Sequence, residues 1–177
     1  MKVAFLDRDG TLIKDYPDEQ WRFIDKVEIF PGTIESLQSL MAMGYELIMI
    51  TNQYLIQDKI ISEEKFLSVH QAFIDDLLNH GIKILDTFYC PHNDDAKCCC
   101  KKPKPGMILN ALDAYPEIDI NHCVMFGDSM VDVGLAAFFD IEVYANTKEK
   151  PIYYKSHHVK NFEEGVKALI KDKKAKI

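Results

Sequence analysis

Residues 3–11 read Val-Ala-Phe-Leu-Asp-Arg-Asp-Gly-Thr, an apolar run that ends abruptly in two acids and a glycine. Four apolar residues before a polar turn are typical of a buried β-strand that enters a loop. Asp7 and Asp9 stand two positions apart, so on an extended segment their side chains point to the same side. Two carboxylates that face one site can bind a hard cation and divide nucleophile and acid roles between them. The stretch therefore predicts a strand with reactive acids at its carboxyl end.

This motif is only moderately specific by itself, because Asp and Gly are also common in plain solvated turns. An EF-hand calcium loop does not fit the stretch. Such a loop needs acids at its first, third and fifth positions and glycine at the sixth. If Asp7 is counted as the first position, Gly10 stands at the fourth. Other motifs in the chain are needed to distinguish a solvated turn from a functional site.

Short apolar runs alternate with stretches of helical spacing along the whole chain. This alternation predicts a parallel sheet with right-handed crossovers and helices on both faces, a Rossmann-like α/β fold. Ligands in such folds bind beyond the carboxyl ends of the strands. We expect strands at 3–6, 47–50, 84–89, 122–126 and 141–144, and helices between 33 and 44, between 63 and 81, over 106–115, through 137 and from 162 onward.

Length and charge limit the classes of function. The 177 residues predict a single domain over residues 1–170 and a basic C-terminal tail at 171–177. The net charge is −7, which gives no support for binding to a nucleic-acid backbone. No segment approaches the roughly 18 apolar residues that span a membrane, and no signal-peptide core precedes Asp7, so we expect a cytoplasmic protein. The sequence specifies no oligomeric state and no pathway partner.

Three further polar clusters stand where a site would need them. Residues 51–53 (Thr-Asn-Gln) follow the second expected strand, and residues 101–102 (Lys-Lys) form a basic pair just before a helix. Residues 127–129 (Gly-Asp-Ser) follow the fourth expected strand, and Asp132 comes four residues after Asp128. Each cluster alone has an ordinary explanation as a cap, a charged loop or a first-turn acid.

Taken together and in this order, the four clusters resemble those of the haloacid-dehalogenase-type phosphatases. The resemblance implies that Asp7 is a nucleophile that forms an aspartyl phosphate, and that Asp9 protonates the leaving oxygen and later helps to activate water. Asp132 would assist the metal site either directly or through the residues around it. The resemblance further implies phosphoryl binding by Thr51 and Lys102, Mg²⁺ ligands at Asp7, Asp9 and Asp128, and substrate-binding positions at Arg8, Asn52, Gln53, Lys101 and Ser129.

The loop at 90–100 holds four cysteines and one histidine in the spacing C-x-H, five residues, then C-x-C. Thiol and imidazole groups with no obvious open position suit a tetrahedral structural Zn²⁺. A turn rich in reduced cysteine is the alternative, but thiols rarely cluster in a loop otherwise filled with polar side chains. The expected zinc ligands are Cys90, His92, Cys98 and Cys100, with Cys99 pointing away from the metal and Cys123 in the core.

The zinc loop narrows the resemblance to the subgroup that contains D-glycero-D-manno-heptose 1,7-bisphosphate phosphatases and the histidinol-phosphate phosphatase domain. Members lack a cap domain, and the spacing of the motifs here agrees, so we expect an open site bordered by loops that include residues 14–30. The resemblance covers about residues 2–145. The chain departs from the usual pattern of the subgroup at positions that bear on the substrate, namely Tyr54, Leu55, Lys101 and Ser129.

The leading hypothesis is a Mg²⁺-dependent phosphatase of a small phosphorylated metabolite, with heptose 1,7-bisphosphate first and histidinol phosphate second. Another small phosphate ester is a further candidate within the same chemistry. A zinc-stabilised binding protein without turnover is the alternative from a different class, and it has no need of a nucleophile beside a general acid. A nucleic-acid 3′-phosphatase is disfavoured by the net charge of −7.

Overall fold

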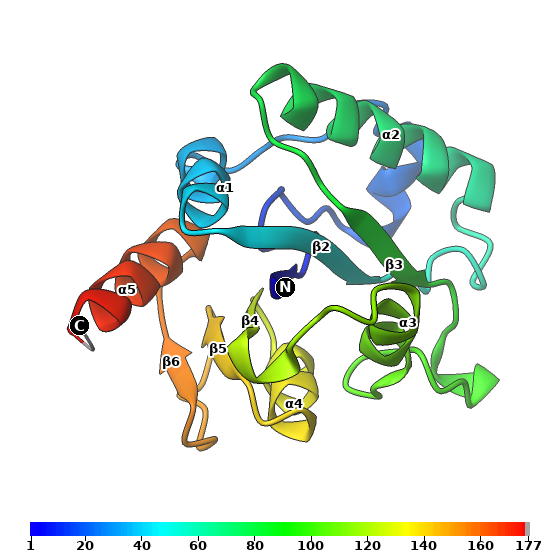
Figure 1. Cartoon of the computed structure of the whole chain (residues 1–177). Coiled ribbons are helices and arrows are strands. Elements are labelled where there is room, and N and C mark those ends of the chain that lie inside the picture. The colour runs from blue at the N-terminus through cyan, green and yellow to red at the C-terminus, as the bar shows by residue number, and fades with distance from the viewer. Residues whose placement is uncertain (176–177) are drawn as a thin grey trace.

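The computed structural model describes residues 1–175, which form a parallel sheet flanked by helices (Figure 1). The bounds of the elements follow the predicted alternation, with a strand leading into a helix along most of the chain. In chain order the elements are β1 (Lys2–Leu6), η1 (Asp18–Phe23), α1 (Thr33–Ala42), β2 (Tyr45–Asn52), α2 (Glu63–Asn79), β3 (Asp86–Cys90), η2 (Asp94–Ala96), α3 (Gly106–Ala114), η3 (Ile120–His122), β4 (Val124–Gly127), α4 (Met130–Phe138), β5 (Glu142–Ala145), β6 (Ser156–His158) and α5 (Phe162–Ala175).

The strand order in the sheet of residues 1–175 is β3-β2-β1-β4-β5-β6, and all five pairings are parallel. The chain builds outward from β1 on one side through β2 and β3, and then returns to the other side of β1 with β4. The order therefore reverses between β1 and β4, and a crevice opens there at the carboxyl ends of the strands. Leu6 pairs with Met49 on one side and with Phe126 on the other, so the residues after β1, β2 and β4 meet at one edge.

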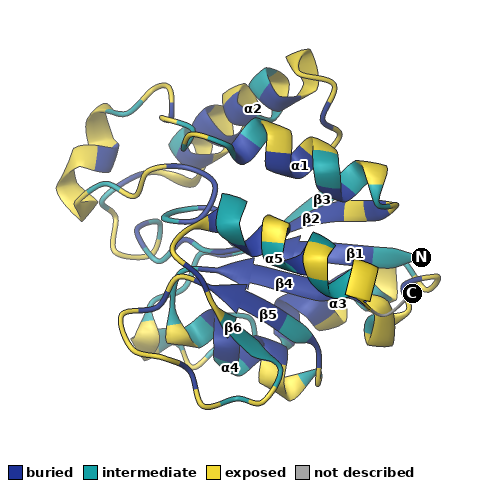
Figure 2. Ribbon diagram, turned by 90° about the vertical axis from the view of Figure 1, so that its left-hand side faces the viewer, coloured by how far each residue is buried: buried dark blue, intermediate teal, exposed yellow. Residues whose placement is uncertain are grey.

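Helices cover both faces of the sheet, as the alternation predicted. Helices α1, α2 and α5 pack on one face, and α3 and α4 pack on the other. Figure 2 shows the central strands almost entirely buried between these two layers. Because both faces are covered, the strands need nearly continuous apolar sequences, and Leu47 and Met49 face one core while Ile48 and Ile50 face the other.

Two local signals fix helix ends where the sequence places them. The Ser62 hydroxyl accepts a hydrogen bond from the Lys65 amide at 3.0 Å and so caps α2. Gly44 has a φ of 81° and turns the chain from α1 into β2. Within residues 1–175, no helix is both long and apolar enough to cross a bilayer.

The structure differs from the sequence prediction at the C-terminal end. Strand β6 was not expected, because its sequence Ser-His-His is polar and it lies at the sheet edge. Helix α5 continues to Ala175, so the segment expected as a tail from residue 171 is helical as far as it is described, and residues 176–177 lie outside the described residues. Asp172 attaches this part of α5 to the sheet, because it accepts a 3.0 Å hydrogen bond from the Tyr144 hydroxyl on β5.

Candidate active site

Strands β1 and β4 bring Asp7 and Asp128 together at the crevice. The Asp7 amide donates to the carbonyl of Phe126 at 2.9 Å, which continues the β1–β4 pairing by one residue. Gly10 has a φ of 82°, and a Cβ atom added there would lie 2.1 Å from Asp128 Oδ2. The turn after β1 therefore requires glycine for both its conformation and the close approach of the acid from β4.

Both carboxylate oxygens of Asp7 are held. Lys102 Nζ donates to Asp7 Oδ1 at 2.7 Å, and the Thr11 hydroxyl donates to Asp7 Oδ2 at 2.8 Å. Burial raises the pKa of Asp7 well above its usual value, the Lys102 ammonium opposes that shift, and the carboxylates of Asp132 and Asp128 add to it. The sequence predicted no role for Thr11, although this residue stands inside the opening motif.

Lys102 is buried between two acids. Its ammonium also donates to Asp132 Oδ1 at 2.7 Å, and this pairing, with that to Asp7, raises the pKa of Lys102 against the opposing effect of burial. The other oxygen of Asp132 accepts from the Asp128 and Ser129 amides at 3.3 and 3.2 Å and from the Ser129 hydroxyl at 2.8 Å. Of the two possibilities for Asp132, these contacts favour action through Lys102 and the start of α4.

Asp9 lies beside Thr51 and Gln53. Gln53 Nε2 donates to Asp9 Oδ2 at 2.6 Å and to Thr51 Oγ1 at 2.8 Å, while the Thr51 hydroxyl lies 3.4 Å from Asp9 Oδ2. The residues after β2 thus hold the acid that follows β1. Asp7, Asp9, Thr51 and Lys102 all line one hollow at the carboxyl edge of the sheet.

Arg8 is buried and does not line this hollow, which does not favour the substrate-binding role expected from the sequence. Its side chain is 1% exposed, and its guanidinium lies over the rings of Trp21 and Phe66, with 5.5 and 5.0 Å to the ring centroids. Arg8 donates to Asp9 Oδ1 from Nη2 at 2.8 Å and from Nε at 3.1 Å. Its neighbour His70 lies 3.5 Å away, and burial followed by the Arg8 charge lowers the pKa of His70 to about 4.

Two other expected substrate-binding residues have partners within the protein. Asn52 brackets the main chain of Lys102, accepting from its amide at 2.9 Å and donating to its carbonyl at 3.2 Å. Lys101 pairs with Asp94 at 2.7 Å and lies 5.3 Å from the centroid of the Tyr54 ring. Asn52 still lines the hollow, as does Ser129, whereas Lys101 does not.

The hollow has a volume of about 270 Å³ and is open to solvent, and residues from the 14–30 segment contribute to its lining. Tyr54 donates to Asp18 Oδ1 at 2.9 Å, and burial together with this bond raises the pKa of Tyr54 to about 12. Burial and the neighbouring Asp9 raise the pKa of Asp15. The 14–30 segment was expected to border the site, but nothing in its sequence singles out particular contacts. Tyr54 and Leu55, which the sequence marked as positions that bear on the substrate, line the hollow, and Val131 is a lining residue to which the sequence did not point.

The donor set in the hollow suits a hard divalent cation. Carboxylate oxygens of Asp7, Asp128 and Asp132 lie within 4.8 Å of one another. Burial, and then the charge of Asp132, raise the pKa of Asp128 to about 6. A cation would relieve this repulsion between buried acids, and oxygen ligands are those that Mg²⁺ prefers. Asp7 and Asp128 line the hollow and Asp132 does not, so Asp7 and Asp128 are the acids within reach of an ion bound there.

The second metal-type cluster gathers in the loop between β3 and α3. Zn–S bonds of about 2.3 Å would place tetrahedral sulfurs about 3.8 Å apart. The sulfurs of Cys90 and Cys98 are 3.7 Å apart, close to this value, and those of Cys90 and Cys100 are closer together, at 2.9 Å. His92 Nδ1 lies 3.5 Å from the Cys90 sulfur and 3.2 Å from that of Cys100. Burial raises the pKa of Cys98, but backbone N–H groups of Lys101 and Cys100 outweigh it and lower the pKa to about 6. The four side chains therefore fit one metal ion.

The remaining cysteines lie outside the cluster, as expected. Cys99 is exposed, and Cys123 is buried, with its sulfur accepting from the Val3 amide at 3.4 Å. The four side chains at 90, 92, 98 and 100 have ligand atoms within 4.8 Å of one another. The cluster lies directly before Lys101 and Lys102, so an ion bound there would anchor the loop that carries Lys102.

Comparison with known proteins places the chain in a family. The sequence profile of the haloacid dehalogenase-like hydrolases matches residues 18–140, and the chain belongs to this family. It is 41% identical over 140 residues to the D-glycero-beta-D-manno-heptose-1,7-bisphosphate 7-phosphatase of Pasteurella multocida, which covers 75% of this chain and 73% of that protein. It is also 37% identical over 136 residues to the histidine biosynthesis bifunctional protein HisB of Buchnera aphidicola, covering 76% of this chain and 38% of that protein.

A solved structure gives the same result for the fold. The D,D-heptose 1,7-bisphosphate phosphatase from B. bronchiseptica, complexed with magnesium and phosphate, matches with a TM-score of 0.82 and 22% identity, and covers 97% of this chain and 99% of that one. The predicted family, its α/β fold and the assignment to the phosphatases are confirmed.

Proposed function

We propose that the chain is a Mg²⁺-dependent phosphomonoester hydrolase that removes the 7-phosphate of D-glycero-D-manno-heptose 1,7-bisphosphate. One contact carries the chemistry of this proposal, the 2.7 Å approach of the Lys102 ammonium to a carboxylate oxygen of Asp7 at the crevice between β1 and β4. A cation fixed beside a carboxylate nucleophile can neutralise a phosphoryl group as it is transferred. Curated heptose bisphosphate phosphatases at 35–41% identity support the substrate and a place in carbohydrate metabolism.

In the first step the Asp7 carboxylate would attack phosphorus, forming a P–O bond as the bond to the sugar oxygen breaks. Thr11 and Lys102 hold the two oxygens of Asp7 and so fix the plane from which the attack occurs. Asp9 would give its proton to the departing alkoxide, and Gln53 with Thr51 positions the oxygen of Asp9 that faces the hollow. Uncatalysed hydrolysis of phosphate monoesters is so slow that positioning and charge neutralisation dominate the catalysis.

In the second step Asp9, now a carboxylate, would accept a proton from water. The resulting hydroxide attacks phosphorus, the bond to Asp7 breaks, and inorganic phosphate leaves. Lys102 and Thr51 would contact the phosphoryl oxygens in both steps. Neither side chain would form a covalent bond, so their contribution comes from their positions.

Mg²⁺ would be held by the carboxylates of Asp7 and Asp128 and by the main-chain carbonyl of Asp9. When bound, it supplies positive charge that offsets the charge of the phosphoryl group. Zn²⁺ would be held by the cluster at 90–100 and would have a structural task, because that loop carries Lys102 into the hollow. Metal-binding thiols need reducing conditions, so we also infer a cytoplasmic location.

We further infer that residues 1–170 act as one catalytic domain, because the two cores share the same sheet. The substrate is a small phosphorylated metabolite, and the net charge of −7 gives no support for a nucleic-acid partner.

Histidinol phosphate is a second candidate, for one structural reason. Asp15, Asp18, Trp21 and Tyr54 line one wall of the hollow, and paired carboxylates beside aromatic rings suit a cationic leaving group. The similarity to HisB agrees with this wall. A leaving group that carries an amine would be attracted to the same acids that repel a second phosphate.

The test is phosphate release in the presence of Mg²⁺ from heptose 1,7-bisphosphate and from histidinol phosphate, measured side by side. We expect a preference for the heptose ester of about 100-fold in kcat/KM, about 2.7 kcal/mol in transition-state discrimination. The reverse preference would assign the chain to the second candidate. Asp7→Asn is the control, and it should abolish turnover while the fold and zinc content stay intact. Retained turnover in Asp7→Asn would exclude Asp7 as the nucleophile, whereas no turnover of either ester by the wild-type protein would leave a zinc-stabilised binding protein as the alternative.

A further inference from the structure

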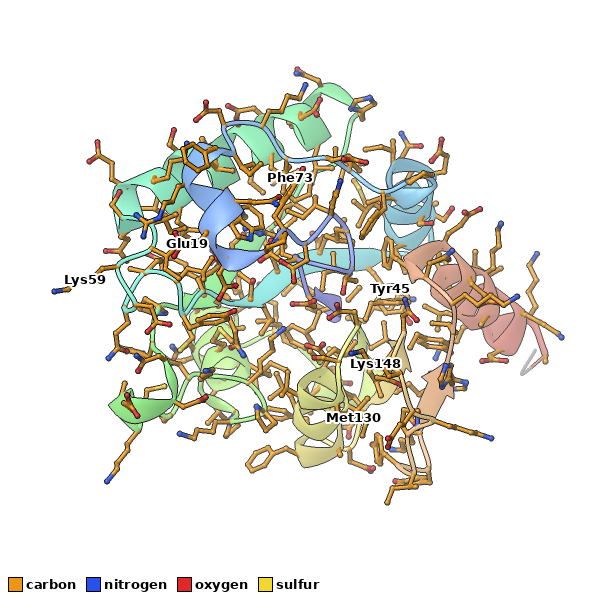
Figure 3. All side chains as sticks on the ribbon, turned by 180° about the vertical axis from the view of Figure 1, so that it is seen from behind. Glu19, Tyr45, Lys59, Phe73, Met130 and Lys148 are labelled. Atoms are coloured by element: carbon orange, nitrogen blue, oxygen red, sulfur yellow. The ribbon has the colours of Figure 1, made fainter. Side chains whose placement is uncertain are left out.

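A second hollow adjoins the catalytic one on the side of β4 and β5. It has a volume of about 290 Å³, and it shares Asp128 and Ser129 with the catalytic hollow. The rest of its wall comes from Met130 at the start of α4 and from residues 147–149 in the loop after β5. Figure 3 shows Met130 and Lys148 on the same side of the molecule, well apart from Glu19 on η1. The two hollows together form a path from the reacting phosphoryl group to this loop.

A bisphosphate needs a second cation for its second phosphate, because a doubly charged group is poorly accommodated without one. The cations near Asp7 are already engaged. Lys102 is bracketed by Asp7 and Asp132, Lys101 pairs with Asp94, and Arg8 is buried on aromatic rings. None of the three offers a free charge to the distal end of a substrate.

Lys148 is differently placed. Within residues 1–175 it is exposed, it lines the second hollow, and it forms no hydrogen bond or ion pair. Thr147 next to it is buried and its hydroxyl donates to the carbonyl of Glu149 at 2.6 Å, which holds the turn that presents Lys148. The ammonium is therefore unpaired and attached to an ordered turn.

The opposite wall repels anions. Asp15 and Asp18 lie on the side of the catalytic hollow formed by the segment between β1 and α1, and the second hollow receives nothing from that segment. The distal end of a substrate whose reacting phosphate sits at Asp7 can extend toward those acids or past Ser129 toward Lys148. Both hollows share Asp128, and Glu149 lines the second one beside Lys148. The first direction adds Asp15 and Asp18 without an unpaired cation, so repulsion between like charges disfavours it more strongly for a second phosphate.

We propose that the second hollow is the subsite for the distal, non-reacting phosphate of the substrate, with Lys148 as its cation and the Met130 side chain against the carbon chain between the phosphates. Met130 is half-exposed and offers an apolar surface beside Ser129. This proposal rests on the proposed function, because it assumes a substrate with two phosphates. It adds a specificity residue from the loop after β5, which none of the four motifs contains.

The test compares Lys148→Ala with Lys150→Ala, the matched control two residues along the same loop that does not line the hollow. For each enzyme kcat/KM is measured with heptose 1,7-bisphosphate and with p-nitrophenyl phosphate, which has no second phosphate. We expect Lys148→Ala to lose about tenfold on the bisphosphate through KM and nothing on p-nitrophenyl phosphate, with Lys150→Ala unchanged on both. Lys148→Arg keeps the charge and should restore most of the loss.

Ionic strength gives a second readout. The KM of the wild-type enzyme for the bisphosphate should rise with added salt, because an exposed ammonium is screened, and this dependence should weaken in Lys148→Ala. Equal losses on both substrates would mean that Lys148 only supports the loop, and no loss on the bisphosphate would remove it from the subsite. A wild-type enzyme that turns over p-nitrophenyl phosphate but not the bisphosphate overturns the proposed function, and the subsite with it, before any variant is compared.

Discussion

The Lys102 ammonium lies 2.7 Å from Asp132 Oδ1, and the Asp132 side chain is completely buried. Asp132 therefore does two tasks with one carboxylate. Its other oxygen forms the capping box at the start of α4 and accepts from the Ser129 hydroxyl at 2.8 Å. Gly127 makes this possible, since a Cβ atom there would lie 2.4 Å from the carboxylate. Lys102 and the helix that follows Asp128 are thus fixed to each other.

Replacing Asp132 should disturb both partners. Asp132→Ala leaves the buried Lys102 with one carboxylate and removes the cap of α4, so we expect a loss of about 3 kcal/mol in the free energy of unfolding. Asp132→Asn keeps the shape and should lose less stability, but kcat should still fall because Lys102 loses half of its countercharge. Urea unfolding and phosphate release measure the two effects. Asp113→Ala on the exposed side of α3 is the control, and if Asp132→Asn keeps full kcat, the positioning role is wrong.

Arg8 holds Asp9 from the side opposite Gln53. In Arg8→Ala the stacking on Trp21 and Phe66 and the two hydrogen bonds to Asp9 are lost together, so we expect a loss of about 3 kcal/mol in the free energy of unfolding and a lower kcat. Arg8→Lys keeps the charge without the planar fork and should recover little of either. Arg22→Ala, whose parent side chain pairs with exposed Glu19, is the matched control for urea unfolding. An effect on KM with unchanged stability would instead return Arg8 to substrate binding.

The sequence was sufficient to predict those parts of the site that depend only on the direction of the strands. Parallel strands end at one edge, so Asp7, Thr51 and Asp128 had to lie near one another once the strands were recognised. The zinc-type cluster could be predicted for a similar reason, because all four ligands lie in one short loop between β3 and α3.

What the sequence could not give were orientations set by packing between distant segments. Arg8 stands between two acids of the motif, and only the rings of Trp21 and Phe66 turn it into the core. From the sequence Asp132 could be an ordinary first-turn acid. Its contact with Lys102 depends on the loop between β3 and α3, which brings the lysine beside it. Lys148 belongs to no motif, and only the fold brings it beside Ser129.

The buried imidazole of His70 predicts a loss of stability in acid. Its pKa is lowered to about 4 by burial and by Arg8, against an ordinary value of 6.5. The unfolded chain therefore binds this proton first as the pH falls, and stability is lost from about pH 6.5 down to about pH 4. The loss should reach about 3 kcal/mol at the low end. The measurement is the difference in the free energy of unfolding by urea between the wild type and His70→Gln across this pH range. The contributions of the other titrating groups cancel in this difference. Parallel profiles for the two proteins would contradict the prediction.

The cluster at 90–100 allows a comparison between two adjacent cysteines. Cys98→Ser removes a ligand whose sulfur lies 3.7 Å from that of Cys90, whereas Cys99→Ser changes an exposed thiol outside the cluster. We expect purified Cys98→Ser to contain almost no zinc by elemental analysis and Cys99→Ser to contain about one ion per chain, because a structural site needs its four ligands. Metal loss should also lower kcat, since the loop sets the main chain of Lys102 against Asn52. Equal zinc content in the two variants would exclude Cys98 as a ligand, and unchanged thermal stability after complete zinc removal would exclude a structural role for the ion.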